Sequence, residues 1–255
     1  PNQADYLFVE STYGDRIHPK EDVFAKLKSI ITKTIQKGGS VVVPSFAVER
    51  TQTLMYLLWQ LKEKKEIPDI PMIMDSPMGA NVLSVFQNYK DWHKLPLKEC
   101  FAMCNAFRIV TEYKDTWEII NSNTSKIIIA GSGMVTGGRV LTYLKYLIDK
   151  PETTLVLVGF QADGTRGRKL LEGEKEIRIY GKNFPVNADI ENIEVLSSHA
   201  DQTELIQWMS EIKKAPKKVF VVHGEPESAE TFKEKITDTY GWNAIVPQLY
   251  DIVEL

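Results

Sequence analysis

Two of the four histidines in the chain stand at corresponding places, each just beyond a run of apolar residues. His199 follows the apolar segment 193–196, and His223 follows the apolar segment 218–222. An imidazole at the end of a strand can bind a metal ion or transfer a proton near neutral pH. Each histidine taken singly is equally consistent with a structural role, but their matching positions favour chemistry. His18 and His93 lack this setting and are predicted to be surface or packing residues.

An acidic residue, Glu10, ends the apolar run 6–9 in the same way. A carboxylate at the end of a strand can hold a histidine ring and polarise it. A simple strand-end cap is the structural alternative. The sequence leaves both interpretations open when Glu10 is considered alone.

Three further segments, 44–52, 131–139 and 161–168, lie between apolar runs and predicted helices or turns. Helix N-termini bind anions, glycines let the backbone approach a phosphate closely, and arginine forks suit phosphate oxygens. The structural alternatives, a helix cap for Ser45 and a surface role for Arg50, stay open. The glycine spacing matches neither a P-loop nor a dinucleotide-binding fingerprint. The predicted phosphate- or RNA-binding residues are Ser45, Arg50, Ser132, Gly133, Thr136, Arg139, Thr165, Arg166 and Arg168.

The elements that must position these residues alternate between strands and helices, and several strands are continuous β-branched runs, as buried parallel strands should be. The chain is therefore predicted to be an α/β protein, with a change to shorter segments after residue 171. Segment 94–107 has no clear period, and 161–167 is predicted to be a loop. Strands are predicted at 6–9, 41–43, 70–74, 127–130, 154–159, 193–196 and 218–222. Helices are predicted at 22–36, 49–64, 82–92, 139–147, 201–213 and 228–240.

Composition sets the broad class of protein. The 255 residues are 43% hydrophobic and 25% charged, which suits a soluble globular protein with a real core. The net charge of −3 gives no bulk attraction to polyanions, so contacts with nucleic acid must come from local clusters. Two cysteines four residues apart are too few for a disulfide framework or a thiolate zinc site. Without a signal peptide or an apolar membrane span, a cytoplasmic location is predicted. Beginning directly on a strand, the chain is expected to be part of a longer polypeptide.

Five motifs, taken together, closely resemble the β-CASP branch of the metallo-β-lactamase fold, whose members are RNA-processing nucleases akin to ribonuclease J and the polyadenylation-cleavage endonuclease. They are Glu-Ser-Thr-Tyr-Gly-Asp from Glu10, Pro-Ser-Phe-Ala-Val-Glu-Arg-Thr-Gln from Pro44, Gly-Ser-Gly-Met-Val-Thr-Gly-Gly-Arg from Gly131, Ser-Ser-His-Ala-Asp from Ser197, and Val-His-Gly-Glu from Val222. The resemblance covers essentially the whole chain. It implies a β-CASP α/β domain, residues 23–187, inserted in the C-terminal part of an αββα metallo-β-lactamase core represented by 1–22 and 188–255.

The resemblance also implies roles for single residues. Glu10 matches the family's motif A carboxylate, and His199 matches the motif B histidine that bonds to it near the scissile phosphate. His223 matches motif C, a ligand to one of two zinc ions, and a histidine there is typical of family members that act on RNA. The implied function is zinc-dependent hydrolysis of RNA phosphodiester bonds, in an endonuclease or exonuclease mode.

The sequence departs from the family in one respect, because it contains no His-x-His-x-Asp-His run. The zinc-dependent activity is therefore expected of the intact protein, whereas this chain alone is expected to be inactive and to bind its two zinc ions incompletely. A non-catalytic RNA-binding or scaffold subunit of the same family is the alternative. A nucleotide-binding module is the third interpretation, which rests only on the glycine loops. RNA is the predicted partner, no membrane partner is predicted, and homodimer formation stays open.

Overall fold

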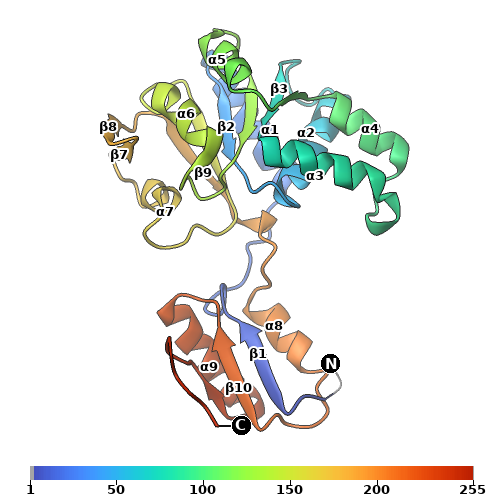
Figure 1. Cartoon of the computed structure of the whole chain (residues 1–255), viewed down its shortest axis with the longest axis vertical. Helices are drawn as coiled ribbons and strands as arrows, with labels where there is room; N and C mark the ends of the chain where they lie inside the picture. Colours follow the sequence, from blue (N-terminus) through green and yellow to red (C-terminus); the bar gives the residue numbers. More distant parts are fainter. Residues whose placement is uncertain (1–2, 255) are drawn as a thin grey trace. The chain divides into compact units, whose positions relative to one another are not determined.

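A computed structural model describes residues 3–254 and divides into two compact units (Figure 1). The smaller unit combines residues up to 20 with residues from 197 onward, and the larger unit comprises residues 21–196. The sequence prediction placed residues 188–255 in the metallo-β-lactamase core. Strand β9 (Asp189–Ile193), which lies within that range, instead pairs with β6 (Thr154–Val158) of the larger unit. The assignment of the three segments as domains stays a prediction.

The larger unit is built on one six-stranded parallel sheet in the order β4-β3-β5-β2-β6-β9. Strands β2, β5 and β6 are buried along their whole length, as their continuous apolar sequences predict. The α/β prediction is therefore confirmed. The strands are β2 (Val41–Pro44), β3 (Met72–Asp75), β4 (Arg108–Val110), β5 (Ile127–Ala130), β6 (Thr154–Val158) and β9 (Asp189–Ile193).

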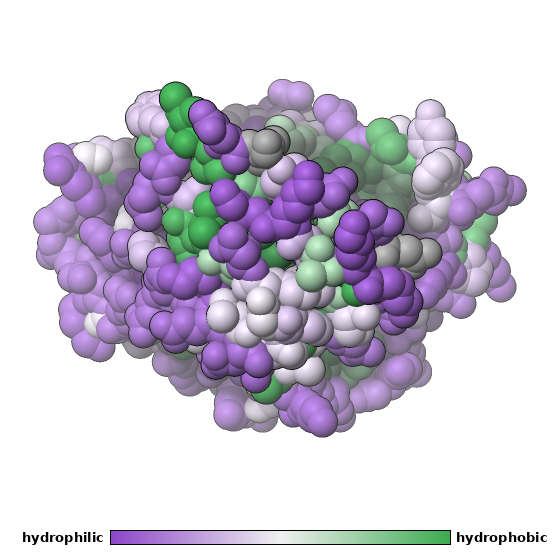
Figure 2. Space-filling model, turned by 90° about the horizontal axis from the view of Figure 1, so that it is seen from below, coloured by the Kyte–Doolittle hydropathy of each residue, from purple (hydrophilic) through white to green (hydrophobic). Residues whose placement is uncertain are grey.

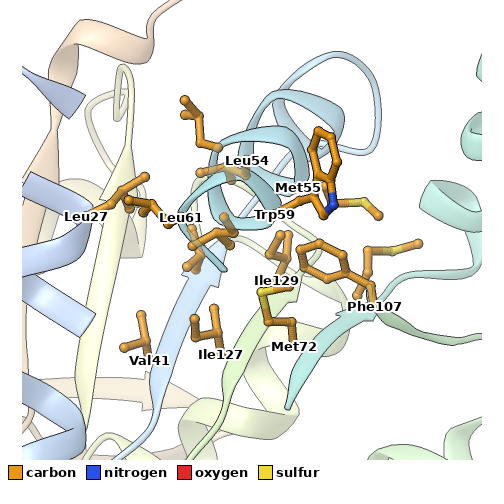
Figure 3. Packing of buried hydrophobic residues seen from close by; sticks show 14 of the residues in the cluster. Leu27, Val41, Leu54, Met55, Trp59, Leu61, Met72, Phe107, Ile127 and Ile129 are labelled. Atoms are coloured by element: carbon orange, nitrogen blue, oxygen red, sulfur yellow. The ribbon is translucent and has the colours of Figure 1, made fainter. Parts of the chain in front are cut away.

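Helices cover both faces of this sheet because successive strand residues point to opposite sides. Val41 and Val43 belong to one buried cluster, shown in Figure 3, and Val42 belongs to the other. The first cluster is closed by α1 (Val23–Gln36), α2 (Arg50–Glu63), α3 (Pro77–Asn88) and α4 (Leu97–Asn105). The second is closed by α5 (Tyr113–Asn121), α6 (Gly138–Leu147), α7 (Arg166–Leu171) and the hairpin of β7 (Glu176–Ile179) and β8 (Lys182–Pro185).

The smaller unit holds a three-stranded parallel sheet in the order β1-β10-β11. Leu7, Val9, Val219 and Val221 lie in its core together with residues of the two helices, among them Phe232. The elements are β1 (Tyr6–Glu10), β10 (Lys218–Val222), β11 (Ala244–Ile245), α8 (Gln202–Met209) and α9 (Pro226–Tyr240).

Several predicted elements were wrong or incomplete. The loop predicted at 161–167 already contains the first residues of α7, and the strand predicted at 193–196 is a 3-10 helix, η2 (Glu194–Leu196), after the last residue of β9. Segment 94–107 contains α4, and β4 and α5 were not predicted. The end of the helix predicted at 82–92 is a separate 3-10 helix, η1 (Lys90–Trp92). These elements are three to nine residues long, too short for a period to stand out from the sequence.

The surface in view in Figure 2 is mostly hydrophilic, with hydrophobic side chains scattered among polar ones. Across residues 3–254, none of the helices has both the length and the apolar character that a bilayer-spanning segment needs.

Candidate functional site

Parallel pairing of β1 with β10 brings Glu10 and His223 to the same edge of the smaller sheet. Glu10 lies opposite Val222, so His223 is the first residue beyond the paired strand. The chain turns sharply there, since His223 has a φ of 55° in the left-handed region. Gly224 follows because a Cβ at that position would lie 2.3 Å from the Ser11 hydroxyl oxygen. The turn holds His223 next to the loop that follows β1.

His199 sits in the loop before α8, and this loop is fixed at both ends. Asp201 caps the helix, accepting from the Glu204 N–H at 2.9 Å while the Glu204 carboxylate accepts from the Asp201 N–H. The other oxygen of Asp201 accepts from the His18 N–H at 2.9 Å. His18 Nε2 lies 2.8 Å from the carbonyl oxygen of His199. His18 therefore supports the candidate site, a role that the sequence did not suggest.

Glu10 and His199 form a direct pair, with Nδ1 of the ring 3.1 Å from Oε1 of the carboxylate. The second carboxylate oxygen accepts from the Thr12 N–H at 3.0 Å. Burial alone would raise the pKa of Glu10, but the hydrogen bonds from Thr12 and His199 outweigh it and hold the pKa below its ordinary value. An ionised carboxylate can only accept, so His199 carries a proton on Nδ1 and presents Nε2 for chemistry.

Thr12 connects the two histidines. Its hydroxyl oxygen lies 3.3 Å from Nδ1 of His199, 3.3 Å from Nδ1 of His223 and 3.1 Å from the carbonyl oxygen of His223. With its single proton donated to that carbonyl, the hydroxyl accepts from Nδ1–H of His223, which leaves Nε2 of His223 with a lone pair. The two rings lie 5.3 Å apart between centroids. Thr12 was not predicted, although its position two residues after Glu10 was a usable signal.

A metal could be held here only in part. Glu10, His199 and His223 each offer a ligand atom, and these atoms lie within 4.8 Å of one another. Both oxygens of Glu10 and Nδ1 of His199 are already engaged in hydrogen bonds. Zinc in proteins takes about four ligands. Nε2 of His199 and Nε2 of His223 are left, so these residues supply at most two of the four ligands and do not make up a two-zinc centre on their own.

The predicted phosphate-binding loops lie side by side in the larger unit, since β5, β2 and β6 are neighbours and all run parallel. The loops also touch one another. Gly133 packs so closely on the Phe46 ring that a Cβ there would lie 2.7 Å from it, and Gln161 Nε2 donates to the Gly133 carbonyl. The Gly167 N–H donates to the Met134 carbonyl at 3.1 Å. The three loops form one surface at the carboxyl edge of the sheet.

Most hydroxyl groups in these loops are engaged inside them. Ser45 is 2% exposed, and its hydroxyl donates to the Phe46 carbonyl while accepting from Thr51. Ser132 accepts from the N–H groups of Thr136 and Gly137. Thr165 caps α7 by accepting from the Arg168 N–H at 3.2 Å. These side chains shape the loops, whereas Thr136 is exposed.

The arginines are engaged as well. Arg139 donates to the Thr116 hydroxyl at 2.9 Å and to the Thr111 carbonyl at 2.8 Å, and its Nε lies 3.8 Å from the buried carboxylate of Asp75. Its guanidinium also stacks over the Tyr113 ring at 4.1 Å, and its side chain is 13% exposed. This placement favours a structural role for Arg139 over the predicted phosphate contact.

The other three arginines are also partly buried. Arg166 donates to the carbonyls of Arg178 and Thr136, which ties α7 to the hairpin and to the glycine loop. Arg168 pairs with Glu172 at 2.7 Å. Arg50 is the first residue of α2 and is partly buried.

Two family models match the amino-acid sequence of the chain. One, described as the Beta-Casp domain, matches residues 51–170, and the other, described as the Zn-dependent metallo-hydrolase RNA specificity domain, matches residues 183–247. The chain belongs to the β-CASP family. His199 and His223 fall inside the second match, while Glu10 precedes both.

Curated relatives agree with this family assignment. The chain is 34% identical over 234 residues to "Ribonuclease TTHA0252" of Thermus thermophilus, covering 89% of this chain and 53% of the relative. It is 33% identical over 250 residues to "RNase J-like protein" of Methanocaldococcus jannaschii, covering 96% and 58%. It is 31% identical over 268 residues to "Transcription termination factor FttA" of Pyrococcus abyssi, covering 99% and 41%. This β-CASP chain spans about half the length of these relatives.

Proposed function

We propose that this β-CASP chain carries the acid/base pair and one metal ligand of a zinc-dependent ribonuclease that hydrolyses RNA phosphodiester bonds. The observation that carries the proposal is the Glu10–His199 pair, set beside His223 where two parallel strands end. The matched family model named for RNA specificity and the relatives named ribonucleases support RNA as the substrate.

The chemistry assigned to this chain follows from its hydrogen bonds. Glu10 fixes the orientation and tautomer of His199 through Nδ1, so Nε2 is the ring atom that passes a proton to the leaving oxygen of the scissile phosphate. Thr12 aligns His199 and His223 through one hydroxyl group. Zinc, when bound by His223 and further ligands, supplies an activated water and neutralises phosphate charge.

The proposal also covers the loops and the state of the isolated chain. We assign contacts with the RNA backbone to the surface formed by the three loops, through Thr136, Arg166 and Arg168. Because the 255 residues contain no His-x-His-x-Asp-His run, this chain alone binds RNA without cleaving it. A cytoplasmic location and homodimer formation stay predictions.

The test uses a polypeptide that joins this chain to a segment bearing His-x-His-x-Asp-His. With His199→Ala, RNA cleavage should fall strongly while zinc content stays the same. Lys233→Ala on α9 is the surface control and should cleave at the parent rate. Unchanged turnover in His199→Ala would remove the acid/base role.

The non-catalytic subunit is distinguished by the same polypeptide. RNA binding without cleavage, in the presence of a full zinc complement, would replace the enzyme proposal with a scaffold function.

A further inference from the structure

A pocket of about 390 Å³ opens among the helices of the larger unit, and its lining includes Glu49 and Gln52 from the segment 44–52 that carries Arg50. Helix α4 packs against α2 and α3 there (Figure 1), and the pocket's wall combines residues of all three helices with the segment between α3 and α4. Its size lies within the range of roughly 300–1,000 Å³ typical of small-molecule sites. Its lining includes Gln52, Tyr56, Phe86, His93, Lys94 and Glu99.

One polar group in the pocket wall is buried without a partner. Gln52 is 4% exposed, and its Nε2 donates to the Ala47 carbonyl at 3.1 Å. That bond fixes the orientation of the amide, since the reverse orientation would set two oxygens against each other. Within the described residues, Oε1 of Gln52 accepts no hydrogen bond. A buried acceptor left unpaired costs about 1–3 kcal/mol, so a donor from a ligand would be favourable here.

The rest of the wall specifies the class of ligand. Phe86 and His93 stack with ring centroids 4.0 Å apart, and Tyr56 adds a third ring. Flat aromatic rings suit a planar ligand. The charged groups at the pocket are the carboxylates of Glu49 and Glu99 and the ammonium of Lys94, so carboxylates outnumber cations.

We propose that this pocket binds a nucleobase that carries an amino group, with guanine preferred. Guanine presents two adjacent donors, N1–H and N2–H₂, which match the Gln52 oxygen and the Glu99 carboxylate. Uracil lacks an amino group and fits these acceptors poorly. The choice of ligand class rests on the proposed RNA-directed function, although base binding requires neither metal nor cleavage.

The base can come from a free nucleoside or from an RNA strand, and the surroundings favour the strand. Trp92, which is 89% exposed, directly precedes the pocket residue His93, and Tyr89, which is 60% exposed, lies between the pocket residues Phe86 and His93 in the chain. Exposed aromatic rings stack successive bases of single strands, and Lys90 and Lys94 add positive charge next to them. A short RNA should thus bind more tightly than a nucleoside.

The test measures binding to the 255-residue chain by calorimetry, with guanosine, adenosine, cytidine and uridine in turn. Guanosine should bind most tightly and uridine about tenfold more weakly, as expected when a polar pocket loses its matching donors. Equal affinity for guanosine and uridine, or tighter binding of the guanidinium compound agmatine, would overturn the proposal.

Two variants test the wall. Gln52→Met keeps the volume but removes the acceptor and should lower guanosine affinity about tenfold. Gln87→Met on α3, outside the pocket lining, is the matched control and should bind like the parent. Because Gln52 also donates to the Ala47 carbonyl, thermal melting must confirm that Gln52→Met is folded. The second variant, Tyr56→Leu, removes a ring from the pocket wall and should also weaken guanosine binding. Parent-like binding by both folded variants contradicts the proposal.

An RNA arm identifies the source of the base. A five-nucleotide RNA with a central guanine should bind at least tenfold more tightly than guanosine, and Trp92→Ala should remove that advantage; comparable affinities would assign the pocket to free nucleosides. If the chain does not bind guanosine but the metal-complete polypeptide still cleaves RNA, the pocket proposal is refuted and the proposed ribonuclease function stands.

Discussion

The two regions that carry candidate chemistry use their polar side chains differently. In the smaller unit, His199 and His223 each engage Nδ1 in positioning and keep Nε2 outside the hydrogen bonds of the described residues. In the larger unit, Arg139 donates to a hydroxyl and a carbonyl of the unit itself. An imidazole has two separate nitrogens, so one can be fixed while the other reacts. A guanidinium whose donors are satisfied internally serves mainly to hold loops in place.

This difference separates two kinds of mutational effect. Substitutions in the histidine cluster should change chemistry and leave stability nearly intact. Substitutions of the buried loop residues should change stability first, and RNA binding only as a consequence. The four predictions below test that separation, beginning with the largest expected effect.

His199→Ala, in the metal-complete polypeptide, should lower the rate of RNA cleavage by about 10²–10⁴-fold because a positioned general acid is lost. The free energy of unfolding should change by less than about 1 kcal/mol, since His199 is partly exposed. Single-turnover cleavage and urea unfolding measure the two quantities. A large loss of stability with a small loss of rate would show that His199 has a structural role and not a chemical one.

Arg139→Met should destabilise the larger unit by about 3 kcal/mol, because it leaves the buried carboxylate of Asp75 without its cation. Thr116 and Tyr143 still donate to that carboxylate, at 2.6 and 2.7 Å, and limit the damage. Urea unfolding measures the change. Arg108→Met is the matched control, because its ion pair with Glu118 lies at the surface, with side chains 46% and 66% exposed, and should contribute less than about 1 kcal/mol.

A variant with wild-type stability but weaker RNA binding would show that Arg139 contacts the phosphate backbone directly.

Thr12→Val keeps the shape of the side chain but removes the hydroxyl that joins the two histidines. Cleavage should fall about tenfold, since one hydrogen bond contributes about 1 kcal/mol and both rings lose a partner. The rate at saturating RNA is the measurement. Thr237→Val, on the exposed face of α9, is the control and should leave that rate unchanged.

Asp201 should make the smaller unit sensitive to acid. Burial alone raises the pKa of Asp201, but hydrogen bonds from the N–H groups of Glu204, His18 and Thr203 outweigh it, so the pKa lies below the ordinary value. A lowered folded-state pKa gives stability that is present above about pH 4 and is lost as pH falls through the folded pKa.

Asp201→Asn keeps a good helix cap while removing the titration. Its stability near pH 7 should stay within about 1 kcal/mol of the parent, and its loss of stability below pH 4 should be smaller. Unfolding measured at a series of pH values tests this. If Asp201→Asn loses as much stability below pH 4 as the parent does, the acid sensitivity comes from other carboxylates.

The sequence alone determined the class of fold and the composition of the candidate active site. Continuous apolar runs such as 41–43 and 127–130 specify buried parallel strands, because both of their faces must meet helices. Glu10, His199 and His223 were found from their positions after such runs. The order of motifs along the chain also gave the family, which the family models confirm.

Only the tertiary structure decided which polar groups are available. Whether Arg139 contacts phosphate or Asp75 depends on residues 64 positions apart in the sequence, 75 and 139, which no local pattern relates. The link that Thr12 makes to both histidines, and the support from His18, arise because strands β1 and β10 pair and the loop before α8 folds back onto them. A sequence fixes which donors exist, but only folding determines which of them remain unpaired.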